Sequence, residues 1–197
     1  MALGGDARVG EVVESSSTGF VSQSYRLYGA PHLGALVRTG GPCPAYGVVH
    51  EVATRGIDPS RRPTARGEGE ASEEDVYRSN PQLEHLLRTD FRAVIVGHAS
   101  EGGTLYHLPP SPPPIYAFVH VCVADELSAF SASTDCLRLL AGSGIAALEE
   151  VVAAFLRHAV AAQPDPQAFL AGAGRQLAAL IPGDFRTVES ILLRAAP

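Results

Sequence analysis

Large apolar and polar residues alternate in short segments along the first half of the chain. Residues 20–27 (FVSQSYRL) show this period of two most clearly, and it is typical of a strand with one buried face. Short runs rich in Val, Ile, Leu, Tyr and Phe occupy residues 9–15, 33–39, 45–54, 91–98 and 104–108. Gly-containing turns separate several of these runs. The pattern predicts about six strands that form a small closed β-barrel, an arrangement that leaves no sheet edge exposed.

One long insertion interrupts the predicted strands. Residues 55–71 have almost no apolar side chains, so we expect an exposed loop. Ser72 then precedes three acids at 73–75, which is the pattern of a helix start, because a Ser side chain caps the first turn and acids favour its positive end. We expect this helix to break at Pro81, to resume with Pro81 in its first turn, and to end near Thr89.

The spacing of apolar residues changes after the proline-rich segment 108–115, which favours an extended and stiff spacer. Helical spacing follows in residues 124–130, 134–141, 145–162, 166–180 and 182–193. The predicted fold class is therefore α+β. A β-barrel domain is expected over residues 7–110, with the loop and helix inserted at 55–90, and an all-helical domain over residues 116–197.

Composition narrows the class of protein. The chain has 197 residues, of which 46% are hydrophobic and 18% charged, as in a globular protein. All 15 basic residues are Arg, and the net charge of -6 argues against broad nonspecific binding of nucleic acid, although a local basic loop is compatible with it. The three cysteines lack metal-ligand spacing. The sequence has neither the charged-then-apolar pattern of a signal peptide nor an apolar run of roughly 20 residues that could span a membrane. We therefore expect a cytoplasmic protein without membrane contact.

Motifs for catalysis are missing from the sequence. A chain without Lys has no phosphate-binding G-x-x-x-x-G-K-[ST] loop, and neither G-x-S-x-G nor H-E-x-x-H occurs. The acids at 73–75 are adjacent on a helix and point in different directions, so a solvated first turn is expected instead of a metal site. We predict no catalytic residue, no metal and no cofactor, and we expect His98, His107 and His120 to be structural.

The loop after residue 54 is the segment best suited to binding. Four arginines stand within twelve residues, stiffened by two prolines: Arg55, Arg61, Arg62 and Arg66. Guanidinium groups bind phosphate or the carboxylates of an acidic protein surface. The alternative is a solvated loop whose arginines pair with acids just downstream, namely Glu68, Glu70, Glu73 and Glu74.

The order of several motifs along the first half resembles the HAS-barrel family. This is the small barrel shared by HerA-type DNA-translocating ATPases and the N-terminal domains of rotary ATP synthase subunits. The motifs that carry the resemblance stand at residues 9–13, 30–37, 46–49, 57–61, 72–77, 80–83 and 91–97. No single motif is specific, and the resemblance rests on their order and spacing over residues 7–110.

The resemblance implies a role in assembling or docking onto a larger machine. In HerA proteins the barrel precedes an ATPase core, helps to build the hexameric ring and offers a surface to the NurA nuclease. Here a helical region follows the barrel instead. We therefore expect a non-catalytic adaptor or ring-assembly subunit that binds a HerA-like ATPase or a NurA-like nuclease, with self-association as a further possibility. The alternatives are a nucleic-acid-binding barrel, disfavoured because Phe20, Tyr25 and Phe91 read as core residues, and a subunit of a metal-dependent nuclease.

Overall fold

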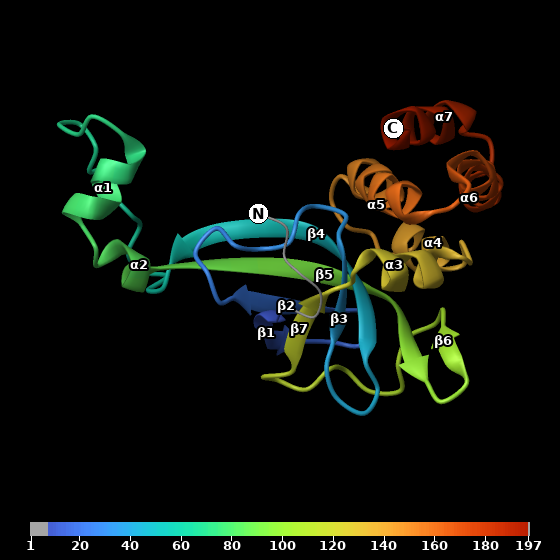
Figure 1. Ribbon diagram of the computed structural model, residues 1–197, viewed down its shortest axis with the longest axis horizontal. Coiled ribbons are helices and arrows are strands. Elements are labelled where there is room, and N and C mark those ends of the chain that lie inside the picture. Colours follow the sequence, from blue (N-terminus) through green and yellow to red (C-terminus); the bar gives the residue numbers. More distant parts are fainter. Residues whose placement is uncertain (1–7, 197) are drawn as a thin grey trace.

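A computed structural model describes residues 8–196 and shows a mixed α+β fold built on one antiparallel sheet (Figure 1). In this part of the chain the strands are β1 (Arg8–Ser15), β2 (Gly19–Ser24), β3 (Leu36–Thr39), β4 (Ala45–Gly56), β5 (Leu87–Ser100), β6 (Gly103–Leu105) and β7 (Phe118–Val121). The strand order is β2-β1-β7-β3-β4-β5-β6, and β5 also pairs with β2. Six strands therefore pair in a ring, and β6 extends the sheet from the end of β5.

Each of the six predicted strand segments contains a strand. The prediction that residues 116–197 are all helical is wrong in one respect. Residues 118–121 were expected in an all-helical region, and they form β7, which pairs with both β1 and β3. The strand predicted at 104–108 is the short β6 and lies outside the ring. Residues 7 and 197, the outer bounds of the two predicted domains, lie outside the described residues.

The inside of the ring is filled by apolar side chains from every one of its strands. Phe91 and Val119 are fully buried there, together with Val12, Val37 and Val49. Gly47 lies at an irregularity in the pairing of β4 with β5, and a Cβ at this position would stand 3.0 Å from the Phe20 ring. A side chain at position 47 would therefore clash with the Phe20 ring.

Five helices follow the ring in the described residues, and as a group they pack against part of its outer face, at β4 and β5. They are α3 (Ala124–Ser131), α4 (Cys136–Ala141), α5 (Leu148–Ala162), α6 (Pro166–Leu180) and α7 (Phe185–Ala195), all close to their predicted positions. The apolar side chains of α5 are buried on both sides, against the sheet and against α6 and α7. From the sheet, Tyr46, Val48 and Val94 belong to this second core. The apolar side chains at 151–156 are thus covered within the chain and are not open to a partner.

Gly34 brings the loop before β3 into backbone contact with α5. Its φ is +76°, and a Cβ would lie 2.4 Å from the Phe155 nitrogen. One turn further along α5, His158 Nε2 lies 3.1 Å from the Leu33 carbonyl oxygen. A residue with a side chain at position 34 would push the helix away from the sheet.

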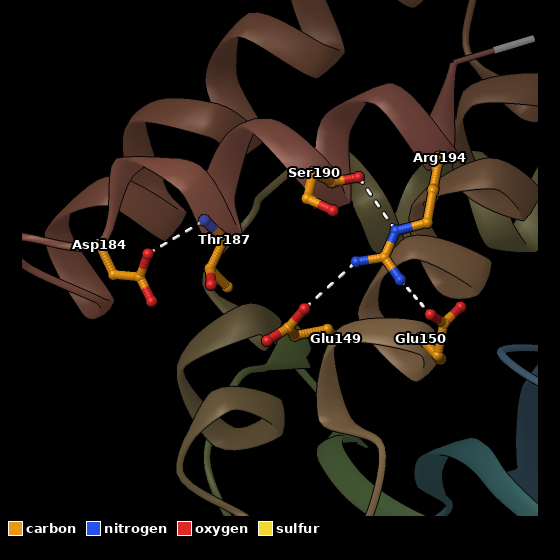
Figure 2. A network of polar contacts seen from close by, with 6 residues as sticks. All are labelled: Glu149, Glu150, Asp184, Thr187, Ser190 and Arg194. Atoms are coloured by element: carbon orange, nitrogen blue, oxygen red, sulfur yellow. Dashed lines mark hydrogen bonds and ion pairs between the residues drawn. The ribbon is translucent and has the colours of Figure 1, made fainter.

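The last helix is fixed to α5 by a small polar network (Figure 2). Arg194 lies between two acids of the first turn of α5: it forms an ion pair with Glu150, and its Nη2 lies 3.3 Å from Glu149 Oε2. The Arg194 Nε also donates to the Ser190 carbonyl at 3.0 Å. At the other end of α7, the Asp184 carboxylate accepts from the Thr187 N–H at 3.1 Å and caps the helix.

At the opposite end of the molecule from α6 and α7, β4 and β5 continue beyond the ring as a two-stranded ribbon that carries α1 (Glu73–Ser79) and α2 (Leu83–Leu86) (Figure 1). We call residues 57–86 the arm. The predicted cap is confirmed, because Ser72 Oγ accepts from the Asp75 N–H at 3.2 Å. The predicted helix end near Thr89 is wrong: α2 ends at Leu86, since the next residues pair with β4.

Candidate functional site

The arm is the most exposed part of the structure and contributes nothing to either apolar core. Neither α1 nor α2 has a buried residue, and residues 57–69 are all exposed. Burial of apolar surface is the main driving force that holds such segments in place. Since the arm buries so little, its shape is kept by turns, caps and a few polar contacts.

The four predicted arginines occupy two parts of this region. Arg55 lies on the ribbon in β4, with its Nη2 3.2 Å from Glu51 Oε1. The other three lie in the loop of the arm and are exposed. Arg61 Nε stands 3.5 Å from Asp58 Oδ2 with 87% of its side chain in solvent, and Arg66 donates to the Asn80 side chain at 3.3 Å. The structure therefore separates Arg55 from Arg61, Arg62 and Arg66, although all four face solvent.

The expected pairing of these arginines with downstream acids is not what the structure shows. The ion pairs that they form between described residues use Glu51 and Asp58, which precede the loop or stand at its start. Glu73 and Glu74 instead lie in the first turn of α1, where acids stabilise the helix. The loop arginines are thus held weakly, because exposed pairs of this kind contribute little.

A tight turn sets the direction of the loop. The Asp58 carboxylate accepts from both the Ser60 hydroxyl at 2.6 Å and the Ser60 N–H at 2.9 Å, and these bonds hold the pKa of Asp58 below its ordinary value. The Arg61 N–H closes the turn on the Asp58 carbonyl at 3.1 Å. Such an Asx turn fixes the backbone from which Arg61 and Arg62 project.

Two apolar side chains stand at the base of the arm and were not singled out from the sequence. Ile57 and Leu86 are 48% and 53% exposed, and the Ile57 N–H donates to the Leu86 carbonyl at 2.9 Å. Alternation along the ribbon puts them on the same face as the directly opposed Arg55 and Arg88. The alternation of β4 does not mark Ile57, which is out of phase with Val52, the large apolar residue before it. An apolar pair beside arginines is a composition common in protein interfaces.

The arm is tied to the body through a chain of hydroxyl groups. Tyr28 and Tyr77 of α1 share a hydrogen bond of 2.5 Å between their hydroxyls, and this bond raises the pKa of Tyr77 to about 12. The Tyr28 N–H donates to Thr89 Oγ1 at 2.9 Å, and Thr89 Oγ1 lies 2.8 Å from Thr54 Oγ1. Tyr28 itself has a φ of +61°, an uncommon conformation for a bulky residue.

A polar groove of about 190 Å³ runs along the ribbon next to the arm. Its charged lining consists of three arginines, Arg55, Arg88 and Arg92, and three acids, Glu14, Glu51 and Asp90. Arg92 Nε lies 3.4 Å from Glu51 Oε2, and Arg88 Nε lies 3.1 Å from Asp90 Oδ2. The Arg88–Asp90 contact is an ion pair whose geometry does not make a hydrogen bond. The groove is therefore close to neutral, and its arginines already have partners.

A larger groove, of about 520 Å³, lies between the β1–β2 turn and the segment that joins α4 to α5. Its titratable side chains are Glu14, His50, Arg92 and Arg138. Burial lowers the pKa of His50, so this side chain is neutral at physiological pH. Charges of both signs line this groove as well, and it favours no particular class of ligand.

The exposure of one aromatic residue corrects the sequence analysis. Phe20 and Phe91 are buried inside the ring as expected, but Tyr25 is 52% exposed. Its hydroxyl donates to Glu11 Oε1 at 2.8 Å, and Glu11 lies directly opposite Phe118 in the pairing of β1 with β7. The Arg8 guanidinium lies 4.5 Å above the centre of the exposed Phe118 ring. Two exposed rings thus share one face of the sheet with an arginine.

Residues 8–196 contain neither a cluster of metal ligands nor a helix suited to spanning a membrane. No group of three or more His, Cys, Asp or Glu side chains there is placed to hold a metal ion. In the same residues, no helix combines the length and apolar character needed to cross a bilayer. His98 is buried and packs edge-on against His107, with ring centres 4.8 Å apart, which fits its predicted structural role.

Comparison with models of known protein families finds none that matches the chain, and comparison with curated proteins finds no similar one. The function is therefore inferred from the residues and their arrangement in the structure.

Proposed function

We propose that this protein is a non-catalytic adaptor or ring-assembly subunit that docks through its arm onto a HerA-like DNA-processing ATPase or a NurA-like nuclease. In this proposal the six-strand ring is a closed barrel of the HAS type, as the order of the sequence motifs suggests. The observation that carries the proposal is the arm: α1 and α2 project from the body with no buried residue. A segment that adds nothing to the core of its own chain is well suited to meet another protein.

The chemistry of the arm indicates how docking would work. Ile57 and Leu86 supply exposed apolar surface, which becomes favourable when a partner covers it. Arg61 and Arg62 lie further out in the loop and would face acidic groups of the partner. Charges at the rim of an interface affect the association rate and orientation more than the final affinity. Docking should therefore be faster at low salt.

Affinity purification of the tagged protein from its native cell tests the proposal. An ATPase or nuclease of the named classes should be recovered with the unaltered chain and lost with a variant that reverses Arg61, Arg62 and Arg66 to Glu. A matched control reverses three exposed arginines of the helical region, Arg157, Arg175 and Arg186, and changes the net charge by the same amount. Recovery of no such partner, or equal loss in both variants, would contradict docking through the arm.

A second candidate function, binding of single-stranded nucleic acid, is favoured by the exposed rings of Tyr25 and Phe118 beside Arg8. Bases stack on aromatic rings at strand surfaces, and each stack contributes about 1–3 kcal/mol. The net charge of -6 works against this function. A Tyr25→Ala/Phe118→Ala variant should lose salt-sensitive binding of single-stranded DNA that the Arg61→Ala/Arg62→Ala/Arg66→Ala variant retains. If the loop variant loses binding instead, the arm is the nucleic-acid contact.

A further inference from the structure

The outer half of β4 has one unpaired edge. β3 pairs with β4 only at Tyr46–Val48, and the Val49 backbone bonds to the loop before β3, with its N–H on the Ala35 carbonyl at 3.0 Å. Beyond the irregularity at His50 and as far as Gly56, the strand pairs within residues 8–196 with β5 alone. The ring therefore leaves a free edge on residues 50–56, although most of its strands have neighbours on both sides.

The direction of the free backbone groups follows from one hydrogen bond. The Ile57 N–H bonds to the Leu86 carbonyl, so alternation turns the backbone groups of residues 55, 53 and 51 toward β5. Those of Val52, Thr54 and Gly56 point to the open side. Within residues 8–196, the backbone N–H and C=O groups of Val52, Thr54 and Gly56 form no backbone hydrogen bond in the turns and loops. An edge of this kind is a template for pairing with another strand.

We infer that this edge pairs antiparallel with the same edge of a second copy, so that Glu51 of each copy faces Arg55 of the other. This surface is distinct from the arm on which the proposed function rests. Antiparallel pairing about a two-fold axis at Ala53 sets Val52 opposite Thr54 of the second copy and joins their free backbone groups. His50 then lies opposite Gly56, and the whole free edge is used.

The charges select this register. Glu51 and Arg55 become a directly opposed pair without mutual backbone bonds, the arrangement in which cross-strand side chains are closest. A shift by two residues sets Glu51 against Ala53 or Ile57 of the second copy and removes both charge pairs. A shift by one residue sets free backbone groups against groups already bonded to β5. At the axis, Ala53 meets Ala53, and the small side chains permit close approach.

The other face of the new pairing is also complementary. Val52 is 45% exposed in the single chain, although it shares its side of the ribbon with the buried Phe91. In the dimer it lies beside Thr54 of the second copy, and β-branched residues are well suited to such positions. The pairing therefore covers an exposed apolar side chain as well as the free backbone groups.

Sedimentation of the full chain and of charge-reversal variants tests the inference. The unaltered protein should form a dimer, and Glu51→Arg or Arg55→Glu alone should weaken dimerisation about tenfold or more, because like charges then face each other across the edge. Mixing the two single variants should restore a dimer, since one chain then carries two arginines at the edge and the other two glutamates. Thermal unfolding of each variant checks that it remains folded.

The controls are two single charge reversals away from the edge, Arg186→Glu and Glu189→Arg, at exposed positions of α7. Each changes the net charge as much as an edge variant does, and each should leave dimerisation unchanged. Within one chain Glu51 also pairs with Arg55 and Arg92, but the loss of these contacts affects only the stability of that chain and cannot make two variants depend on each other. A chain that stays monomeric at every concentration overturns the inference. So does a dimer that the edge variants leave intact, or one that mixing fails to restore.

Discussion

Each of the three cysteine side chains lies in a different part of the fold. Cys122 follows β7 and Cys136 begins α4, and both are buried, whereas Cys43 stands half-buried in the turn before β4. Burial raises the pKa of the Cys122 and Cys136 thiols, so these groups stay protonated at neutral pH. The thiolate is the reactive form, and their environment suppresses it.

A thiol reagent should therefore distinguish the three positions. At pH 8 we expect an aromatic disulfide reagent to modify Cys43 in the folded protein and to leave Cys122 and Cys136 unmodified. The same reagent should label all three after unfolding in guanidinium chloride. Mass spectrometry of the labelled peptides identifies the sites, and rapid native labelling of Cys136 would contradict the burial described for α4.

Gly34 is the residue whose replacement should be most costly to the joint between sheet and helices. Gly34→Ala adds both a strained φ and a contact with the α5 backbone, and we expect it to lower the free energy of unfolding by roughly 2–4 kcal/mol. Gly144→Ala is a matched control, because Gly144 has a similar φ of +67° with open space around it. It should cost only about 1 kcal/mol. Denaturant unfolding of both variants gives the comparison, and equal costs would mean that α5 moves easily.

Single residues were predictable where one local rule decides their role. The cap at Ser72 was predicted from residue type and neighbours, namely a Ser followed by three acids. Tyr25 was assigned wrongly, because alternation in residues 20–27 suggests a strand throughout, whereas β2 ends at Ser24. An aromatic residue near the end of a strand is buried or exposed according to where the strand ends. No local pattern in residues 20–27 marks the end of β2 at Ser24.

Among the elements, the arm depends most on a single contact with the body. The Tyr28–Tyr77 hydrogen bond requires at least one protonated hydroxyl. Because the pKa of Tyr77 is raised above that of a free tyrosine, its contribution to stability is complete below about pH 10. It is lost as the pH rises from about 10 to about 12. Alkaline pH should thus release α1 while the cores remain intact.

Ultraviolet titration of tyrosinate formation measures this directly. Burial also raises the pKa of Tyr25, Tyr46 and Tyr106, so several tyrosines should ionise above pH 10, and Tyr77→Phe should remove one of them, the step near pH 12. Tyr28→Phe should move it toward pH 10, since the shift comes mainly from the Tyr28 hydroxyl. A step near pH 12 that keeps its full amplitude in Tyr77→Phe would assign that pKa to another tyrosine.

The helices were predicted almost completely from sequence, whereas β7 was missed, for a physical reason. A helix is held by bonds between neighbouring residues, so its apolar period is visible locally. β7 has only four residues between a proline-rich segment and α3, and its strand character comes from pairing with β1 and β3. Long-range pairing of this kind leaves little trace in the segment itself. The free edge of β4 is invisible for the same reason.

At the scale of the whole molecule, the sheet and the helices share one of the two cores. Leu36, Tyr46, Val48 and Val96 of the sheet pack in the same cluster as Phe130, Phe155 and Leu156. The two regions expected as separate domains from the sequence are therefore joined over a continuous apolar contact. Separating them would expose this surface to water on both sides.

Unfolding should accordingly occur in one step. We expect a single calorimetric transition whose van't Hoff and calorimetric enthalpies agree, with loss of helix and of sheet at the same temperature. Circular dichroism and tyrosine fluorescence provide the two probes. A helical region that melts well before the sheet would show that the shared core is weak, and Gly34→Ala should then change the first transition alone.

The position of β7 also governs the order in which the protein can form during synthesis. β1 and β3 leave the ribosome early, yet the strand that joins them lies beyond the arm, β5 and the proline-rich segment. Until Val121 has emerged, both strands lack a neighbour on one side, and their free edges are open to other nascent chains. Ring closure is a non-local step and therefore slow. Production of this protein should therefore benefit from chaperones that shield the edges of β1 and β3 until β7 has emerged.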